Sequence, residues 1–220
     1  MINNSPWLWN DNKTAAGMTT RTSRGQRIIQ GKRTKGQSNP SEAYLLSQRI
    51  AAVIWPYFRY ASGFIKQFWT RKTTGQTAAS QFYAYTYDNA MDTTDPMAPV
   101  IVPADLKFAT GTMTPTPILT LTGDVSDNEI RFTWTAAPSD DSQNSNDAVW
   151  YVLRNRTKNI WRSGSISDRS SGDSGAIVPG SLNIAAGDII DLYANFLGVE
   201  GEPNAGLVSD SAFKTATVTA

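Results

Sequence analysis

The spacing of hydrophobic and polar residues divides the chain into a helical part and a β-rich part. Between residues 39 and 92 large apolar side chains recur at steps of three and four, which is the spacing of one helix face. From about Pro117 onward the chain changes to short β-type runs separated by turn residues. We therefore expect an α+β protein in which the helices precede the strands.

A first helix is predicted to begin at Asn39. This residue can cap the helix, Pro40 suits the first helical position, and Glu42 lies three residues beyond the cap. Pro56 is predicted to end or kink the helix near Trp55, because proline lacks the N–H that continues the hydrogen-bond ladder. The apolar face of this helix is formed by Leu45, Leu46, Ile50, Val53 and Ile54.

Two further helices are predicted over residues 57–70 and 76–92. Aromatic residues here are interleaved with cations, which is one way to build a surface on which nucleic-acid bases stack. Large apolar groups at helical spacing more often form a core or a subunit interface, and we favour that interpretation. The cations are Arg59, Lys66, Arg71 and Lys72.

Seven short strands are predicted in the second half of the chain, as expected for an all-β immunoglobulin-like sandwich. Ile130, Phe132 and Trp134 alternate with polar residues, so one face of their strand should be buried, with Trp134 as the core anchor. The run 148–153 lacks alternation and is typical of a central strand. The predicted strands are 117–123, 129–135, 148–155, 159–162, 175–178, 189–197 and 207–219.

The run 189–197 has its own alternation. Asp191, Tyr193 and Asn195 alternate with three apolar residues, which predicts one buried face and one solvent-exposed face. Two polar loops, 139–147 and 163–175, lie between strands, and loops on a rigid scaffold are frequent binding sites. The apolar members of this alternation are Leu192, Ala194 and Phe196.

Charge is distributed unevenly along the chain. Residues 1–72 contain twelve Lys and Arg against two acidic residues, a net charge of +10, so residues 73–220 carry −9. Such a division suits a front half that meets an anionic partner, and it also allows copies to meet head to tail. The predicted anion-binding or partner-binding cations are Arg21, Arg24, Arg27, Lys32, Arg33 and Lys35.

Four segments follow from these patterns. Residues 1–38 form an extended basic arm, because the stretch 13–38 is too polar to build a core of its own. Residues 39–95 form the helical region, 96–116 a linker, and 117–220 the sandwich. The arm can serve protein docking, phosphate contacts with nucleic acid, or only the solubility of the chain.

Composition removes most routes to catalysis. The chain contains no cysteine and no histidine, so thiolate nucleophiles, disulfides and histidine acid–base chemistry are excluded. Residues 172–175 read Gly-Asp-Ser-Gly, like the nucleophile motif of trypsin-like proteases, but no histidine can activate that serine. No phosphate-binding loop or dinucleotide fingerprint occurs, and no carboxylate pair is singled out for glycoside hydrolysis. We expect no enzymatic activity and no cofactor.

Metal binding and membrane insertion are likewise not expected. Asp140, Asp141 and Asp147 offer carboxylates for calcium, but no EF-hand pattern surrounds them. Residues 1–10 lack the basic lead and the apolar core of a secretory signal, and no window approaches the roughly 20 apolar residues of a membrane span. We expect a soluble protein.

Several short motifs follow one another in a recognisable order along the chain. After a Gly-rich basic opening, they are Asn39-Pro40-Ser41 with Gln48-Arg49, the helix 78–90, Phe132-Thr133-Trp134, Asn146-Asp147-Ala148-Val149, Gly187-Asp188 and Ser209-Asp210-Ser211. This order resembles an uncharacterised family, a domain of unknown function common in genomes of Bacteroidota and their phages. The sequence departs from the usual members at its opening, where Gly17-Met18-Thr19-Thr20 and Gly31-Lys32 replace a Gly-Lys-Val-Gly and a Trp-Lys-Gly segment. The family implies an architecture and assigns no catalytic residues.

Together with the layout, this resemblance implies a non-enzymatic structural or assembly protein. We expect a bacteriophage virion component of the capsid, collar or tail, assembled in the bacterial cytoplasm, with other virion proteins and copies of itself as partners. The arm and helices would dock while the sandwich projects. The alternatives are a nucleic-acid-binding protein that uses the arm on phosphates, and a surface module that binds glycans or host protein through the sandwich loops.

Overall fold

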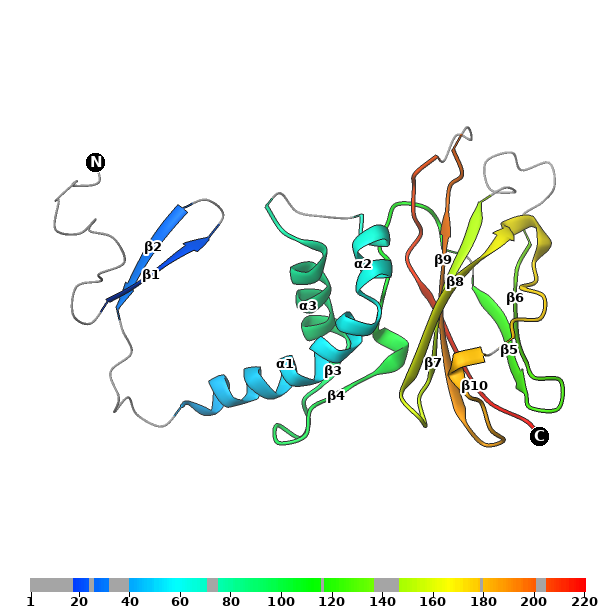
Figure 1. Cartoon of the computed structure of the whole chain (residues 1–220), viewed down its shortest axis with the longest axis horizontal. Coiled ribbons are helices and arrows are strands. Elements are labelled where there is room, and N and C mark those ends of the chain that lie inside the picture. The colour runs from blue at the N-terminus through cyan, green and yellow to red at the C-terminus, as the bar shows by residue number, and fades with distance from the viewer. Residues whose placement is uncertain are drawn as a thin grey trace. The chain divides into compact units, whose positions relative to one another are not determined.

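The computed structural model describes residues 18–23, 26–31, 40–70, 75–115, 117–136, 147–178, 180–200 and 205–220. It is a mixed helix-and-strand protein, as the sequence predicts at that level (Figure 1). The chain divides into two compact units, Met1–Leu45 and Leu46–Ala220. In the first unit, β1 (Met18–Ser23) and β2 (Gln26–Gly31) pair as an antiparallel hairpin. Part of the predicted extended arm therefore consists of paired strands.

Helix α1 (Glu42–Tyr60) begins later and ends later than predicted. Asn39, the predicted cap, lies outside the described residues, and the capping contact is made by Ser41, whose hydroxyl accepts a 3.3 Å hydrogen bond from the Tyr44 N–H. Of the two effects predicted for Pro56, an end or a kink near Trp55, the end is wrong, since the helix continues to Tyr60. Proline leaves the Ala52 carbonyl without its helical donor, and the exposure of Ala52 lets water take that place.

The other two helices, α2 (Ser62–Phe68) and α3 (Ala78–Asn89), are shorter than the predicted ranges. A capping box of Thr77 and Ser80 starts α3, with the Thr77 hydroxyl accepting from the Ser80 N–H at 3.1 Å.

The predicted apolar face of α1 is confirmed for four of its five residues. Ile50 and Ile54 are fully buried, and Leu46 and Val53 pack against the same core. Leu45 is half-buried and is not among the residues of that core.

The segment 96–116, predicted as a linker, packs into the protein core. It contributes the short strand β4 (Val100–Ile101), which pairs with β3 (Met91–Asp92), and the 3-10 helix η2 (Pro103–Asp105). Leu106 and Phe108 from this segment are almost fully buried. The helices and the strands of the second unit are therefore joined by a shared core.

The second half of the chain forms two antiparallel sheets. Their strands are β5 (Ile118–Asp124), β6 (Glu129–Trp134), β7 (Ala148–Asn155), β8 (Ile160–Asp168), β9 (Ile189–Leu197) and β10 (Ala212–Thr217). Two 3-10 helices, η3 (Arg169–Ser171) and η4 (Gly180–Leu182), lie between β8 and β9 in the sequence. β5 pairs with β6, and a four-stranded sheet has the order β10-β9-β7-β8, which confirms the run 148–153 as part of a central strand. Residues 175–178 form no strand, and Ile177 makes only an isolated bridge to Ile130.

The four-stranded sheet is covered on both faces, with the helices on one side and β5 and β6 on the other (Figure 1). The prediction of a solvent-exposed face on β9 is therefore wrong. Phe196 packs toward β5 and β6, where Trp134 is buried as predicted, whereas Tyr193 packs into the helical core. Asp191 and Asn195 are also fully buried. Successive side chains of β9 therefore point alternately into two different cores.

Candidate functional site

Two of the six cations predicted to bind a partner lie in the N-terminal hairpin. Arg21 is in β1 opposite Ile28, and Arg27 is in β2 opposite Thr22. The remaining four, Arg24, Lys32, Arg33 and Lys35, lie outside the described residues. The structure thus places two of the six on one hairpin and does not assemble the six into a described site.

A second set of aromatic and basic residues does come together. Trp55, Phe58 and Arg59 of α1 and Ser62 and Lys66 of α2 line a surface groove of about 330 Å³. Trp55 is 41% exposed, although large aromatic side chains are usually buried. The interleaving of aromatic residues and cations in the sequence is therefore realised as one local surface.

The aromatic part of this surface continues onto α3. Trp55 stacks on Tyr83 with ring centroids 5.7 Å apart and an interplanar angle of 28°, and Tyr83 stacks on Tyr87 at 6.3 Å and 27°. Tyr83 and Tyr87 are four residues apart, so they lie on one side of α3. We call the whole surface the aromatic–basic face, and its members are Trp55, Phe58, Arg59, Lys66, Tyr83 and Tyr87.

Several cations of the described structure form ion pairs, but the two cations of the aromatic–basic face do not. In the described part of the chain, neither Arg59 nor Lys66 forms an ion pair, and both are exposed. Burial raises the pKa of Tyr83, and the neighbouring Tyr87 raises it further, so the Tyr83 phenol stays neutral. The cations of the remaining structure that do form ion pairs are Lys107, Arg131, Arg156, Lys158 and Arg169.

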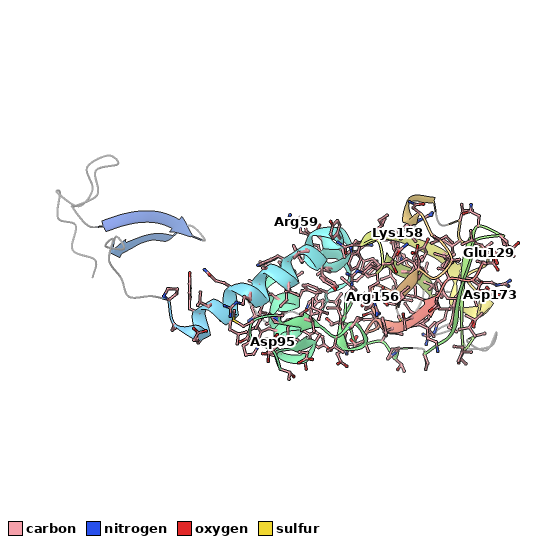
Figure 2. All side chains as sticks on the ribbon, turned by 90° about the horizontal axis from the view of Figure 1, so that it is seen from below. Arg59, Asp95, Glu129, Arg156, Lys158 and Asp173 are labelled. Carbon is pink, nitrogen blue, oxygen red and sulfur yellow. The ribbon has the colours of Figure 1, made fainter. Side chains whose placement is uncertain are left out.

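An acidic edge lies elsewhere on the same helical layer. It consists of Asp88, near the C-terminus of α3, with Asp92 and Asp95 in and after β3, and all three are exposed. Hydrogen bonds from the Thr94 side chain and backbone lower the pKa of Asp92. Arg49 reaches this region by donating to the Pro96 carbonyl at 3.2 Å. Figure 2 shows Arg59 and Asp95 on opposite edges of the helices.

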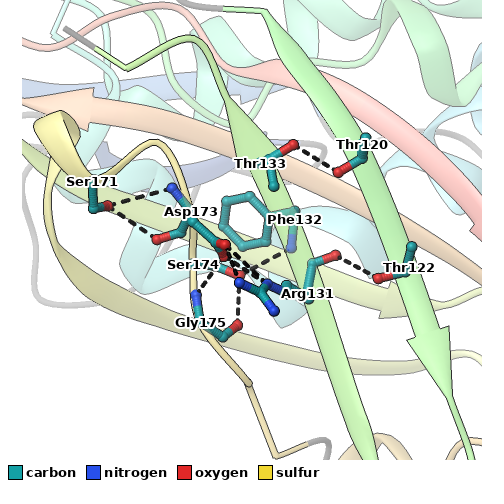
Figure 3. Close-up of polar contacts among 9 residues, drawn as sticks. All are labelled: Thr120, Thr122, Arg131, Phe132, Thr133, Ser171, Asp173, Ser174 and Gly175. Carbon is teal, nitrogen blue, oxygen red and sulfur yellow. Dashed lines mark hydrogen bonds and ion pairs between the residues drawn. The ribbon is translucent and has the colours of Figure 1, made fainter. Parts of the chain in front are cut away.

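The Gly-Asp-Ser-Gly motif serves the packing of the β-rich half of the chain (Figure 3). The buried Ser174 hydroxyl accepts from the Phe132 N–H at 2.9 Å and donates to the Gly175 carbonyl at 2.8 Å. Both carboxylate oxygens of Asp173 accept hydrogen bonds from Arg131, and this ion pair lowers the pKa of the Asp173 carboxyl. Both contacts fasten the segment after η3 to strand β6, so the motif has a structural role.

Of the three carboxylates considered for calcium in the sequence, only Asp147 lies in the described residues. Asp147 is 1% exposed and forms a 3.2 Å ion pair with Arg169. Asp140 and Asp141 lie outside the described residues. Within the ranges that the structure describes, no three acidic side chains converge as a metal would require. Nor does any helix in those ranges have the length and apolar character needed to cross a bilayer.

Comparison with known proteins gives no match: no family model fits the chain, and no curated protein is significantly similar to it.

The sequence analysis had singled out Arg59 and Lys66 but missed Tyr83, Tyr87 and the acidic edge. Two signals were available for them. The tyrosines have the four-residue spacing of a helix face, and the carboxylates cluster between positions 88 and 95.

Proposed function

We propose that this protein is a non-enzymatic structural and assembly protein that binds the acidic edge of a neighbouring copy with its aromatic–basic face. The observation that carries the proposal is the groove in which exposed Arg59 and Lys66, without ion-pair partners in the described structure, flank exposed Trp55. Interfaces between proteins are enriched in aromatic residues and arginine, and a few such residues carry most of the binding free energy.

A second copy is the partner that the charges favour. Asp88, Asp92 and Asp95 supply negative charge to complement Arg59 and Lys66. Because Arg59 and Asp95 lie on opposite edges of the helical layer, one copy can use both surfaces at once with two different neighbours (Figure 2). Such a head-to-tail contact builds a ring or a filament, depending on whether the rotation closes.

The setting that we propose is a bacteriophage virion, as a component of the capsid, collar or tail. The support is the family resemblance described above and the layout of a basic arm, docking helices and a projecting β-rich half. We further propose that β5 to β10 represent an immunoglobulin-like sandwich, supported by two antiparallel sheets with an apolar layer between them.

Single-stranded nucleic acid would be the other occupant of an aromatic and basic groove. Base stacking needs an open ring face. Here one face of the Trp55 ring is covered by Tyr83, and one face of the Tyr60 ring is covered by Trp161 at 5.8 Å and 13°. These contacts leave fewer open ring faces for bases, and oligonucleotide binding is one outcome of the test below.

Sedimentation velocity at low and high salt tests the proposal. We expect the wild-type chain to associate at about 50 mM salt and to dissociate at about 500 mM, because exposed charge pairs are screened. Lys66→Glu should abolish association, whereas the matched control Lys214→Glu on β10 should retain it, with thermal melts confirming that both are folded. A monomeric wild type, or one that associates only when a single-stranded oligonucleotide is added, would contradict docking between copies.

Limited proteolysis tests the virion setting. If the arm docks in a particle, tryptic cleavage between Arg21 and Lys35 should be slower in the native particle than in the free chain. Equal cleavage in both, or absence of the chain from purified particles, would reject that setting and leave self-association to be judged on its own.

A further inference from the structure

A second cavity, of about 300 Å³, opens on the side of α3 that faces away from the aromatic–basic face. Gln81 and Tyr85 of α3 line it, and each lies two positions from a member of the stacked tyrosine pair, Tyr83 and Tyr87. Two residues on a helix correspond to a rotation of roughly 200°. The two surfaces are therefore separate and can be changed independently.

One part of the cavity wall is aromatic. Trp69 and Tyr85 meet edge to face with their centroids 5.9 Å apart, and both line the cavity beside the small side chain of Ala84. The Tyr85 hydroxyl donates to the Asp105 carbonyl at 3.3 Å, which fixes the ring. Burial raises the pKa of Tyr85, so the ring is a neutral platform over the range in which proteins function.

Charged groups in the cavity neutralise one another. Lys107 Nζ lies 2.7 Å from one carboxylate oxygen of Asp210, and the other oxygen accepts from the Gly111 N–H at 3.1 Å. The Lys107 ammonium also lies 5.5 Å from the centroid of Tyr85. The cavity thus offers one charge-assisted donor and one charge-assisted acceptor but no net charge, which disfavours an anion or a cation as ligand.

The remaining polar groups are amides and a hydroxyl. Gln81 Nε2 donates to Gln76 Oε1 at 2.8 Å, so the two side chains form a hydrogen-bonded pair at the cavity wall. Thr110 also lines the cavity, and its buried hydroxyl has no hydrogen-bond partner among the described residues. Donors and acceptors therefore surround an aromatic wall without a dominant charge.

We propose that this cavity binds a neutral carbohydrate ring. A pyranose presents C–H groups that pack on an aromatic face and hydroxyls that both donate and accept, which matches Tyr85, the Lys107–Asp210 pair and the two glutamines. The volume lies at the small end of the roughly 300–1,000 Å³ of ligand pockets, which suits one sugar ring. This proposal does not rest on the docking of copies.

Saturation-transfer difference NMR with the full chain tests the site. The probes are methyl glycosides of glucose, galactose, mannose and N-acetylglucosamine, with glutamate and gluconate as charged comparators. We expect at least one neutral glycoside to bind with a dissociation constant on the order of 1 mM, as small polar ligands do. No saturation from any of the four, or saturation only from a charged comparator, overturns the proposal.

Variants locate the binding. Asp210→Asn removes the charge-assisted acceptor and should weaken glycoside binding by about tenfold. Gln76→Ala, at an exposed position, should weaken it severalfold. Gln67→Ala, an exposed glutamine on α2, is the matched control and should leave binding unchanged. If Gln76→Ala and Asp210→Asn both bind as the wild type does, the sugar sits elsewhere and the assignment is wrong.

Discussion

At the scale of single residues, buried carboxylates of the sheet are held by specific donors. Asp191 is fully buried and accepts from Arg156 Nε at 2.8 Å. Asp188 is 5% exposed and accepts from Asn155 Nδ2 at 2.8 Å and from the Ala185 N–H at 2.9 Å. Buried charges persist in proteins only when partners replace the lost water, so these contacts are needed for the strands to pair as they do.

Asp188 makes the stability of the protein depend on pH. Burial alone would raise the pKa of Asp188, but hydrogen bonds from Lys158, Asn155 and the Ala185 N–H outweigh it and lower the pKa. A carboxyl whose pKa is lower in the folded state stabilises the fold above its unfolded pKa of about 3.9, and this stabilisation is lost as the pH falls through the folded pKa.

We therefore expect Asp188→Asn to be less stable than the wild type at pH 7 and the difference to shrink below about pH 4. Urea denaturation at a series of pH values measures it. Asp127→Asn is the matched control at an exposed position. A difference that stays constant from pH 7 to pH 3 would show that the charge of Asp188 does not matter.

At the scale of elements, local patterns predicted strands better than helix ends. The bounds of β5, β6, β7 and β9 lie within one or two residues of the predicted runs, because period-two alternation and turn residues are local signals. The double burial of β9 was missed because it depends on helices that are distant in sequence. The end of α1 was missed because exposure of Ala52, which tolerates Pro56, is set by tertiary packing.

Pro56 gives a prediction at this scale. Pro56→Ala restores an N–H that can donate to the Ala52 carbonyl within α1. We expect the free energy of unfolding to rise by about 1 kcal/mol or more, since proline inside a helix costs up to roughly 3 kcal/mol. Thermal melts measure the change, with exposed Ala52→Ser as a control that should lower stability slightly. A destabilised Pro56→Ala would mean that proline is required for the path of α1.

At the scale of the whole molecule, an aromatic cluster joins the helices to the sheet. Phe108 lies 5.8 Å from Phe82 of α3, 5.8 Å from Trp161 of β8 and 4.7 Å from Tyr193 of β9, measured between ring centroids. The sequence predicted separate helical and sandwich segments joined by a linker over residues 96–116, although apolar residues such as Val102, Leu106 and Phe108 recur there. Their burial between two layers could not be read from local spacing.

This cluster predicts cooperative unfolding. Phe108→Ala should lower the free energy of unfolding by about 3–5 kcal/mol, because it leaves a cavity between the layers. Far-ultraviolet circular dichroism and tryptophan fluorescence should still report one coincident transition in the wild type and the variant. Two separated transitions in the wild type would instead support independent helical and sandwich domains.

The candidate site was predictable only in part. Arg59 and Lys66 stood out in the sequence because they interrupt an aromatic stretch. Whether a cation is paired depends on contacts across the fold, as for Lys107 and Asp210, which are 103 residues apart. The distinction between a paired cation and one exposed in a groove is therefore a property of the folded chain.

The central claim, head-to-tail docking between copies, is tested most directly by mixing two variants that each lack one surface. Arg59→Glu/Lys66→Glu keeps the acidic edge, and Asp92→Lys/Asp95→Lys keeps the aromatic–basic face. We expect each to sediment as a monomer alone and the equimolar mixture to form a dimer that does not grow further, because one complementary pair of surfaces remains. A mixture that stays monomeric while the wild type associates would contradict the account.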